Sequence, residues 1–362
     1  MTVVGGETGL QTPLPPTTSA TRRIFRRVAD AGRAHEEGAW RWAARVAVVL
    51  PLAALVFAVT VLLIKALPAI RVNGWDFLTG SAWNPGSAYG ATVHTDGVAH
   101  PSGSSYGAWP AIAGTLQTSA IALILAVPIS IGAAFALTER LPGWISRPLG
   151  LALEVLAGIP SVVIGLWGLL TLGPILAHHV YPIVADHMPD VPFFRYFRNP
   201  VGEGEGLLTA GIVLALMIIP IVASTTRDLF TQVPPLPKEG GHALGLTDWE
   251  VANRVTLPWV RSGIIGATAL GLGRALGETI AVALITGSIL GHLAPNIYSP
   301  MSTIAATILT QLDGAQTDGT GFAVATLAEL GLVLAVLSVG VNLTARLIVS
   351  RTSRLGAPVG RG

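Results

Sequence analysis

Cysteine is absent from the 362-residue sequence, and charged residues are scarce. The absence of thiols excludes disulfides, thiolate catalysis and cysteine-ligated metals. Charged residues make up 12% of the chain, whereas hydrophobic residues make up 51%; an ordinary soluble domain carries about twice as much charge. These proportions predict a polytopic membrane protein. The net charge of +2 gives no indication of a nucleic-acid partner.

Lysine is nearly absent too, with Lys65 and Lys238 as its only two occurrences. No G-x-x-x-x-G-K-[ST] loop, which would bind the phosphates of ATP, is therefore present. We also find no nucleophile paired with a base and no set of metal ligands, so we expect no catalytic residues, no metal site and no enzyme activity. His179 and His187, which flank Asp186, are too far apart for one helical turn and are interpreted as part of a surface loop.

Six apolar segments are each long enough to cross a bilayer, for which about 20 residues suffice. They lie at about 43–67, 111–137, 149–176, 206–226, 262–290 and 324–349. The sequence therefore predicts an all-α transmembrane domain of six helices over residues 43–349. The first apolar run begins too late for a secretory signal peptide, so we expect it to be an uncleaved span.

Basic residues indicate the orientation of these spans. With the N-terminus inside, 17 Lys and Arg residues fall in inside segments and four in outside loops, so the positive-inside rule places both termini in the cytoplasm. Residues 1–42 are expected to be a cytoplasmic tail that includes a basic interfacial helix, rather than an RNA-binding arm, and 350–362 a second tail. The outside loops 68–110 and 177–205 are long and turn-rich, which favours a docking surface for an external partner.

The fifth segment carries two ionisable residues in its middle, Arg274 and Glu278. Each costs about 2.5–3.5 kcal/mol to insert, so such residues usually face a bundle interior or water. In a continuous helix they lie one turn apart and can pair. Small residues at four-residue spacing flank them and predict closely packed neighbouring helices. These are Ala269, Gly273, Gly277 and Ala281 on one side, and Gly271, Ala275, Thr279 and Ala283 on the other.

Two interpretations of this pair are open: a structural ion pair that locks two helices, or a site that meets an anion in transit. We favour the second, because a guanidinium donates two hydrogen bonds to a phosphate-like oxyanion and stays charged. The hydroxyl of Thr279 can serve the same path or bond to helix backbone. In the third segment Pro160 is expected to kink the helix, and Ser161 can face the path or pair with the freed backbone.

Residues 234–258 form a candidate cytoplasmic loop between the fourth and fifth segments. Prolines at its start are followed by a short helix that is expected to end at Gly245. Thr247 and Glu250 form a capping box at the start of a second helix. We expect Leu257-Pro258 to stop this second helix before the next span. A helix–turn–helix of this kind has a suitable shape for docking a soluble partner.

This loop resembles the EAA loop of ABC importer permeases, Glu-Ala-Ala, three residues, Gly, nine residues, Ile-x-Leu-Pro. The matching residues are Glu239, Gly245, Val255, Leu257 and Pro258, while Gly240 and Gly241 depart from the usual alanines. GLGRALGET at 271–279, AGIPSVVIG at 157–165 and FLTGSAWNP at 77–85 are similar to the C-type permease subunits of bacterial phosphate importers. The companion A-type subunits carry a motif similar to the first. The resemblance covers about residues 43–350.

The resemblance implies a type I ABC importer permease in a bacterial cell membrane, embedded in lipid. It implies an A-type sister permease, two copies of an ATPase subunit and an external phosphate-binding protein as partners, with ATP and Mg bound by the ATPase and no cofactor by this chain. Docking of the ATPase would involve Glu239, Gly245, Thr247, Leu257 and Pro258. The phosphate path would be lined by Arg274 and Glu278, and Thr279 and Ser161 are the additional hydroxyl candidates described above.

Other functions are weighed on the same residues. The architecture can also carry another oxyanion, such as sulfate or molybdate, because Arg274 alone does not distinguish tetrahedral anions. A secondary transporter should show internal repeats, of which we find no convincing example, and it has no need of an EAA loop. A sensor of phosphate status would act through partners, since the chain carries no kinase or receiver signature.

Overall fold

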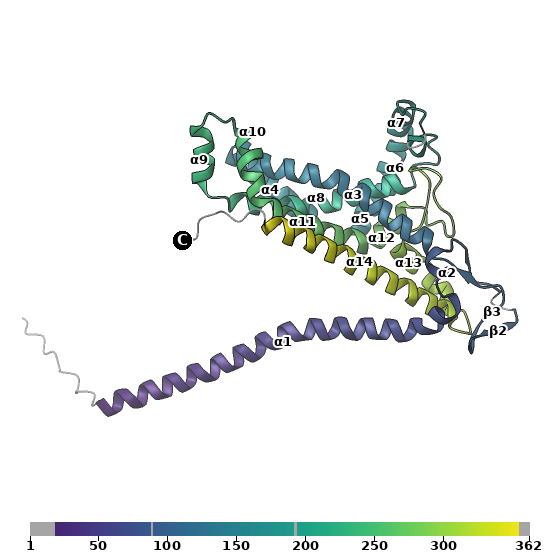
Figure 1. The fold of residues 1–362 in the computed structure, drawn as a ribbon, viewed down its shortest axis with the longest axis horizontal. Coiled ribbons are helices and arrows are strands. Elements are labelled where there is room, and N and C mark those ends of the chain that lie inside the picture. The colour runs from purple at the N-terminus through teal and green to yellow at the C-terminus, as the bar shows by residue number, and fades with distance from the viewer. Residues whose placement is uncertain (1–18, 88–89, 192–193, 355–362) are drawn as a thin grey trace, which may run out of the picture. The chain divides into compact units, whose positions relative to one another are not determined.

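A computed structural model describes residues 19–87, 90–191 and 194–354. The chain divides into two compact units, Met1–Val61 and Leu62–Gly362. Helix α1 (Ser19–Asn73) begins in the first unit and ends in the second, and it is helical without a break, so the expected interfacial helix and the first span are one helix (Figure 1). All its side chains between residues 42 and 61 are exposed. An apolar helix with this exposure is suited to lipid or to another membrane chain.

Six helical stretches of the described residues are long and apolar enough to cross a membrane. They are Trp42–Asn73, Trp109–Arg140, Ser161–Asp186, Leu207–Thr231, Asp248–Gly277 and Phe322–Ile348. The predicted all-α class with six spans is confirmed, and the chain is a multi-pass membrane protein.

Helix α8 (Leu207–Thr231) is the central element of the second unit, because 72% of the residues in its most apolar stretch are buried. It packs against α3 (Trp109–Phe135) and α11 (Leu257–Gly277), which run beside it in Figure 1. Glycines make both approaches close: Gly211 of α8 lies against Ile121, and Gly271 of α11 lies against Ile218. Since a bilayer gives helices no hydrophobic drive to associate, such close packing is what holds them together.

The segment between the first and second spans is structured. It contains α2 (Asp76–Thr79) and two antiparallel pairs, β1 (Trp83–Asn84) with β4 (Ser105–Tyr106), and β2 (Thr92–Thr95) with β3 (Val98–Pro101). The β2–β3 pair turns at Asp96 and Gly97, both at positive φ, which is the backbone that a two-residue Asp-Gly hairpin requires.

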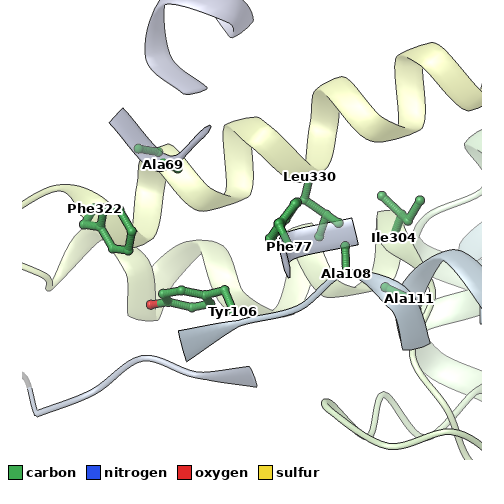
Figure 2. Close-up of a cluster of buried hydrophobic side chains, with 9 residues drawn as sticks. Ala69, Phe77, Tyr106, Ala108, Ala111, Ile304, Phe322 and Leu330 are labelled. Atoms are coloured by element: carbon green, nitrogen blue, oxygen red, sulfur yellow. The ribbon is translucent and has the colours of Figure 1, made fainter. Parts of the chain in front are cut away.

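A buried apolar cluster joins this segment to the helices. Figure 2 shows Phe77 of α2 and Tyr106 of β4 together with Leu330 of α14 (Phe322–Arg354) and Ile304 of α13 (Ile304–Gln316). The members also include Ala69, Ala108, Ala111, Phe322 and Ala325. The cluster therefore fixes the segment after the first span onto the start of the sixth.

Asp318 closes the N-terminus of α14. Its carboxylate accepts hydrogen bonds from the backbone nitrogens of Thr320 and Ala323, each at 2.9 Å, and from the Thr320 hydroxyl. Burial alone would raise the pKa of Asp318, but these hydrogen bonds outweigh it and hold the pKa below its usual value. The carboxylate therefore caps the helix in its charged form.

The third span differs from the expected segment 149–176. Helix α4 (Gly143–Ala157) ends before Pro160, and α5 (Ser161–Trp167) starts after it. Pro160 adopts an extended conformation (ψ 135°), so it breaks the helix, where a kink was expected. The span then continues to residue 186 through η2 (Gly168–Leu172), α6 (Gly173–Ile175), η3 (Leu176–Val180) and α7 (Tyr181–Asp186).

Replacing Phe77 with alanine tests the apolar cluster. Removing this fully buried ring should lower the free energy of unfolding by about 3–5 kcal/mol, because a cavity is left among packed neighbours. Thermal melting of the detergent-purified protein measures the effect. Trp75→Ala is the matched control, since that ring is 82% exposed, and equal melting of the two variants would contradict the assignment.

Candidate functional site

The fifth span is interrupted where a continuous helix was expected. Helix α11 ends at Gly277, Glu278 is extended (φ −70°, ψ 124°), and a second helix, α12 (Ile280–Ile285), follows. The prediction that Arg274 and Glu278 lie one turn apart on a single helix is therefore wrong. Within the described part of the chain, no ion pair joins them.

The helix ends at a glycine, Gly277, which lowers the cost of leaving the helical conformation there. Gly277 has no side chain to hold it against a neighbour, and a Cβ placed there would meet nothing within 4 Å; glycine also costs about 1 kcal/mol relative to alanine within a helix. At the far end of α12, the carbonyls of Ile285 and Thr286 accept from the backbone nitrogens of Gly206 and Met301, both at 2.9 Å. The short helix is thus secured by hydrogen bonds to other segments.

Arg274 lies on the one face of α11 that its neighbours leave open. Gly271 packs on α8, and Gly273 faces Asn342 of α14. The two stripes of small residues that contain these glycines therefore each meet another helix, as expected. Arg274 and, one turn before it, Leu270 are exposed, whereas Glu278 is half-buried at the interruption. The arginine is thus presented away from this chain's own bundle.

The two hydroxyl candidates lie at the two helix interruptions. The hydroxyl of Thr279 donates a hydrogen bond to the backbone carbonyl of Gly277 at 3.1 Å. This is the bond to helix backbone that the sequence allowed as the alternative to a role in the path. Ser161 is the half-buried first residue of α5, directly after Pro160.

The two interrupted spans pack against each other. Helix α5 contacts α12, and a Cβ on Gly165 would lie 2.7 Å from the Cα of Ala281, so the two backbones are in direct contact there. Ile164, Ala281 and Ile285 belong to one buried cluster. The sequence placed Ala281 in a small-residue stripe but did not identify its partner. The sequence feature that could have indicated this partner is Gly165 in the third segment, because a glycine lets another backbone approach closely.

The candidate loop folds as expected except at its start, where prolines lie in the first turn of the first helix rather than before it. Helix α9 (Pro235–Ala243) is followed by Gly245 at φ +80°, and Thr247 caps α10 (Asp248–Val251) in a complete capping box with Glu250. Gly241, a departure from the usual alanine, is buried against Val251, so the missing methyl lets α9 and α10 approach.

Leu257-Pro258 does not stop the second helix, contrary to the expectation. A π-helical turn, η5 (Ala252–Thr256), leads directly into α11, with Pro258 in its first turn. Proline fits in this turn because its ring fixes φ at about −65°, which is a helical value. The fifth span therefore continues the loop's second helix without interruption.

The loop exposes Glu239 together with large apolar side chains. Leu236, Leu244 and Trp249 have exposed fractions of 76%, 84% and 57%. An exposed apolar group of this kind is typical of a surface that binds another protein.

The histidine-rich segment was expected to be a surface loop, but it is helical up to Asp186. His178 lies 3.3 Å from Glu203, and Nδ1 of His187 lies 2.7 Å from the carbonyl of Ile183. Over residues 19–87, 90–191 and 194–354, no three His, Asp or Glu side chains gather as metal ligands would.

Comparison with known proteins agrees with a six-span helical membrane protein. Residues 126–354 match the family described as "Binding-protein-dependent transport system inner membrane component". The chain belongs to this family and is a permease subunit of an ABC importer.

Its relatives are more specific. The chain is 58% identical to "Phosphate transport system permease protein PstC 1" of Mycobacterium tuberculosis, over 94% of this chain and all of that protein. It is 41% identical to the PstC protein of Pasteurella multocida, over 76% of this chain and 85% of that protein. Among solved structures, it is similar to an inward-facing MetNI methionine ABC transporter, with a TM-score of 0.46 and 16% identity over 68% of this chain and 94% of that one.

Replacing Gly165 with alanine tests the contact between α5 and α12. The added Cβ meets backbone, which cannot move aside as a flexible side chain would, so the variant should be destabilised by about 1–3 kcal/mol. A fall in melting temperature of the purified protein measures this. Gly132→Ala is the control, since a Cβ there meets nothing within 4 Å; equal effects of both substitutions would refute the contact.

Proposed function

We propose that this chain is a PstC-type permease that forms one half of the transmembrane path of an ATP-driven importer of inorganic phosphate. The observation that carries the proposal is Arg274, exposed beside an interruption of the fifth span on the one open face of α11. The relatives named as phosphate permeases, which align over most of the chain, support phosphate as the substrate.

The chemistry of the interruption supports this role. Arg274 supplies a permanent positive charge and a two-pronged donor that matches phosphate oxygens. Glu278, on the extended backbone just after α11, supplies negative charge near the path, which keeps phosphate from binding too tightly to leave. Ser161 and Thr279 provide hydroxyls at the two interruptions, where non-helical backbone in a membrane requires protein or water beside it.

The open face of α11 implies a second permease. A PstA-type sister chain would cover Arg274 and complete the path, and a PstS-type phosphate-binding protein would deliver phosphate from outside. With both termini in the cytoplasm, the 234–258 loop would dock on one of the two PstB-type ATPase subunits, which bind ATP and Mg. Because α10 runs through η5 into α11, movement of the docked ATPase would reach the segment that carries Arg274.

Arg274→Gln and Glu278→Gln should abolish phosphate uptake while the complex still assembles. The arginine substitution alone should reduce uptake at least about tenfold, since a charge-assisted hydrogen bond contributes roughly 1.5–3 kcal/mol. Uptake of phosphate and of sulfate is measured in vesicles that contain all partner subunits. Arg346→Gln, the same substitution at an exposed arginine of α14, is the control. Normal uptake in the Arg274 variant would reject the path assignment, and preferential sulfate uptake by the unmodified complex would reject phosphate.

Substitution of the loop should instead impair ATPase docking. Glu239→Ala removes an exposed charge, and Gly245→Val forces a β-branched residue to φ +80°, which costs about 1–3 kcal/mol. Both variants should co-purify with less ATPase subunit. Gly240→Ala is the control, because α9 is helical there and a Cβ meets nothing within 4 Å. Full recovery of ATPase with both loop variants would remove the docking assignment.

A further inference from the structure

Two ion pairs connect the end of the second span to the loop. Helix α3 continues as a π-helical turn, η1 (Ala136–Arg140), whose last two residues carry opposite charges. Glu139 accepts a hydrogen bond from Lys238 on α9, and Arg140 lies 3.3 Å from the carboxylate of Asp248 on α10. One pair of adjacent residues therefore contacts both helices of the loop.

The two pairs differ in burial. The side chains of Lys238 and Glu139 are 21% and 26% exposed, whereas those of Arg140 and Asp248 are 51% and 56% exposed. Exposed ion pairs contribute little because water screens them, so the Lys238–Glu139 pair is the stronger contact. It lines a cavity of about 180 Å³ whose other walls include Thr256.

Aromatic packing reinforces this junction. The ring of Phe135, at the end of α3, meets the ring of Trp249 edge-on at 5.8 Å between centroids. An edge-on aromatic pair stabilises a contact beyond the area that it buries. The junction between α3 and the loop thus combines charge, hydrogen bonding and packing.

Neighbouring residues on α9 have separate roles. Lys238 is directed to Glu139, while Glu239 is exposed on the surface.

The end of α3 that lies away from the loop is tied to α13, since the hydroxyl of Thr115 accepts a hydrogen bond from the backbone nitrogen of Ile304 at 2.9 Å. Between these ends, α3 packs along α8. A force applied at Lys238 therefore has a continuous route along the whole second span.

We infer that Glu139, Arg140, Lys238 and Asp248 form a clamp through which movement of the ATPase-docked loop is passed to α3, in addition to its direct connection to α11. The inference rests on the proposed function. These are positioning residues: they touch neither phosphate nor ATP, and they set how far the second span follows the loop. Breaking the clamp leaves the docking surface in place but separates ATP hydrolysis from movement of the path.

Charge exchange in the complete reconstituted complex tests the clamp. Glu139→Lys and Lys238→Glu should each lower the phosphate imported per ATP hydrolysed by about tenfold, equivalent to 1.4 kcal/mol, with unchanged co-purification of the ATPase. The double exchange, which restores opposite charges, should recover the ratio to within about twofold. Arg254→Gln is the control, because Arg254 pairs with Glu250 inside the loop at 3.6 Å and does not contact α3.

A second test does not require that the charge-exchange variants assemble. The chain has no cysteine, so Glu139→Cys with Lys238→Cys introduces its only two thiols. The reduced variant should import less phosphate per ATP, and bridging the thiols with a short bifunctional maleimide should restore the ratio. The inference of a clamp would be wrong if Glu139→Lys and Lys238→Glu left the phosphate imported per ATP hydrolysed unchanged, or if bridging the two thiols had no effect on it. Failure of the unmodified complex to import phosphate would instead count against the proposed function.

Discussion

Backbone hydrogen bonding is the constraint on which the arrangement of this chain depends. In lipid a polypeptide can leave the helical conformation only where protein or water satisfies its freed N–H and C=O groups. Within the described residues, the helical conformation is broken before Ser161 and after Gly277, and the helices that follow, α5 and α12, pack together through Gly165 and Ala281. Each interruption therefore has protein beside it. The polar side chains of the candidate path are consequently concentrated there.

Close helix packing around α8 determines which surfaces stay open. Gly211 and Gly271 bring α3 and α11 onto the central helix, and Gly273 lies toward α14. With those sides of α11 occupied, Arg274 projects from the remaining one. A charged side chain on an open face of a membrane bundle is costly in lipid. A second permease that covers this face and shares a water-filled path with it would remove that cost.

The second span links the two ends of the bundle. Thr115 ties its first part to α13, next to the apolar cluster of Phe77 and Leu330, and Glu139 ties its last turn to the loop. The fifth span connects to the same loop through the backbone. The loop is therefore joined covalently to α8 and α11 and non-covalently to α3, and substitutions at the charged junction affect the non-covalent connection alone.

The sequence by itself determined the class of this protein, its number of spans and the loop with its capping box. These follow from local rules: apolar run length, helix capping by Thr247, and the left-handed backbone that Gly245 adopts after α9. It also identified Arg274, since an ionisable residue inside an apolar run stands out without any knowledge of its neighbours. Only the tertiary structure decided that α11 ends at Gly277, that Pro160 breaks its span, that Leu257-Pro258 continues a helix, and that Lys238 meets Glu139. A helix ends or continues according to what its neighbours can bond and pack against, and residues 99 positions apart are brought together only by the fold.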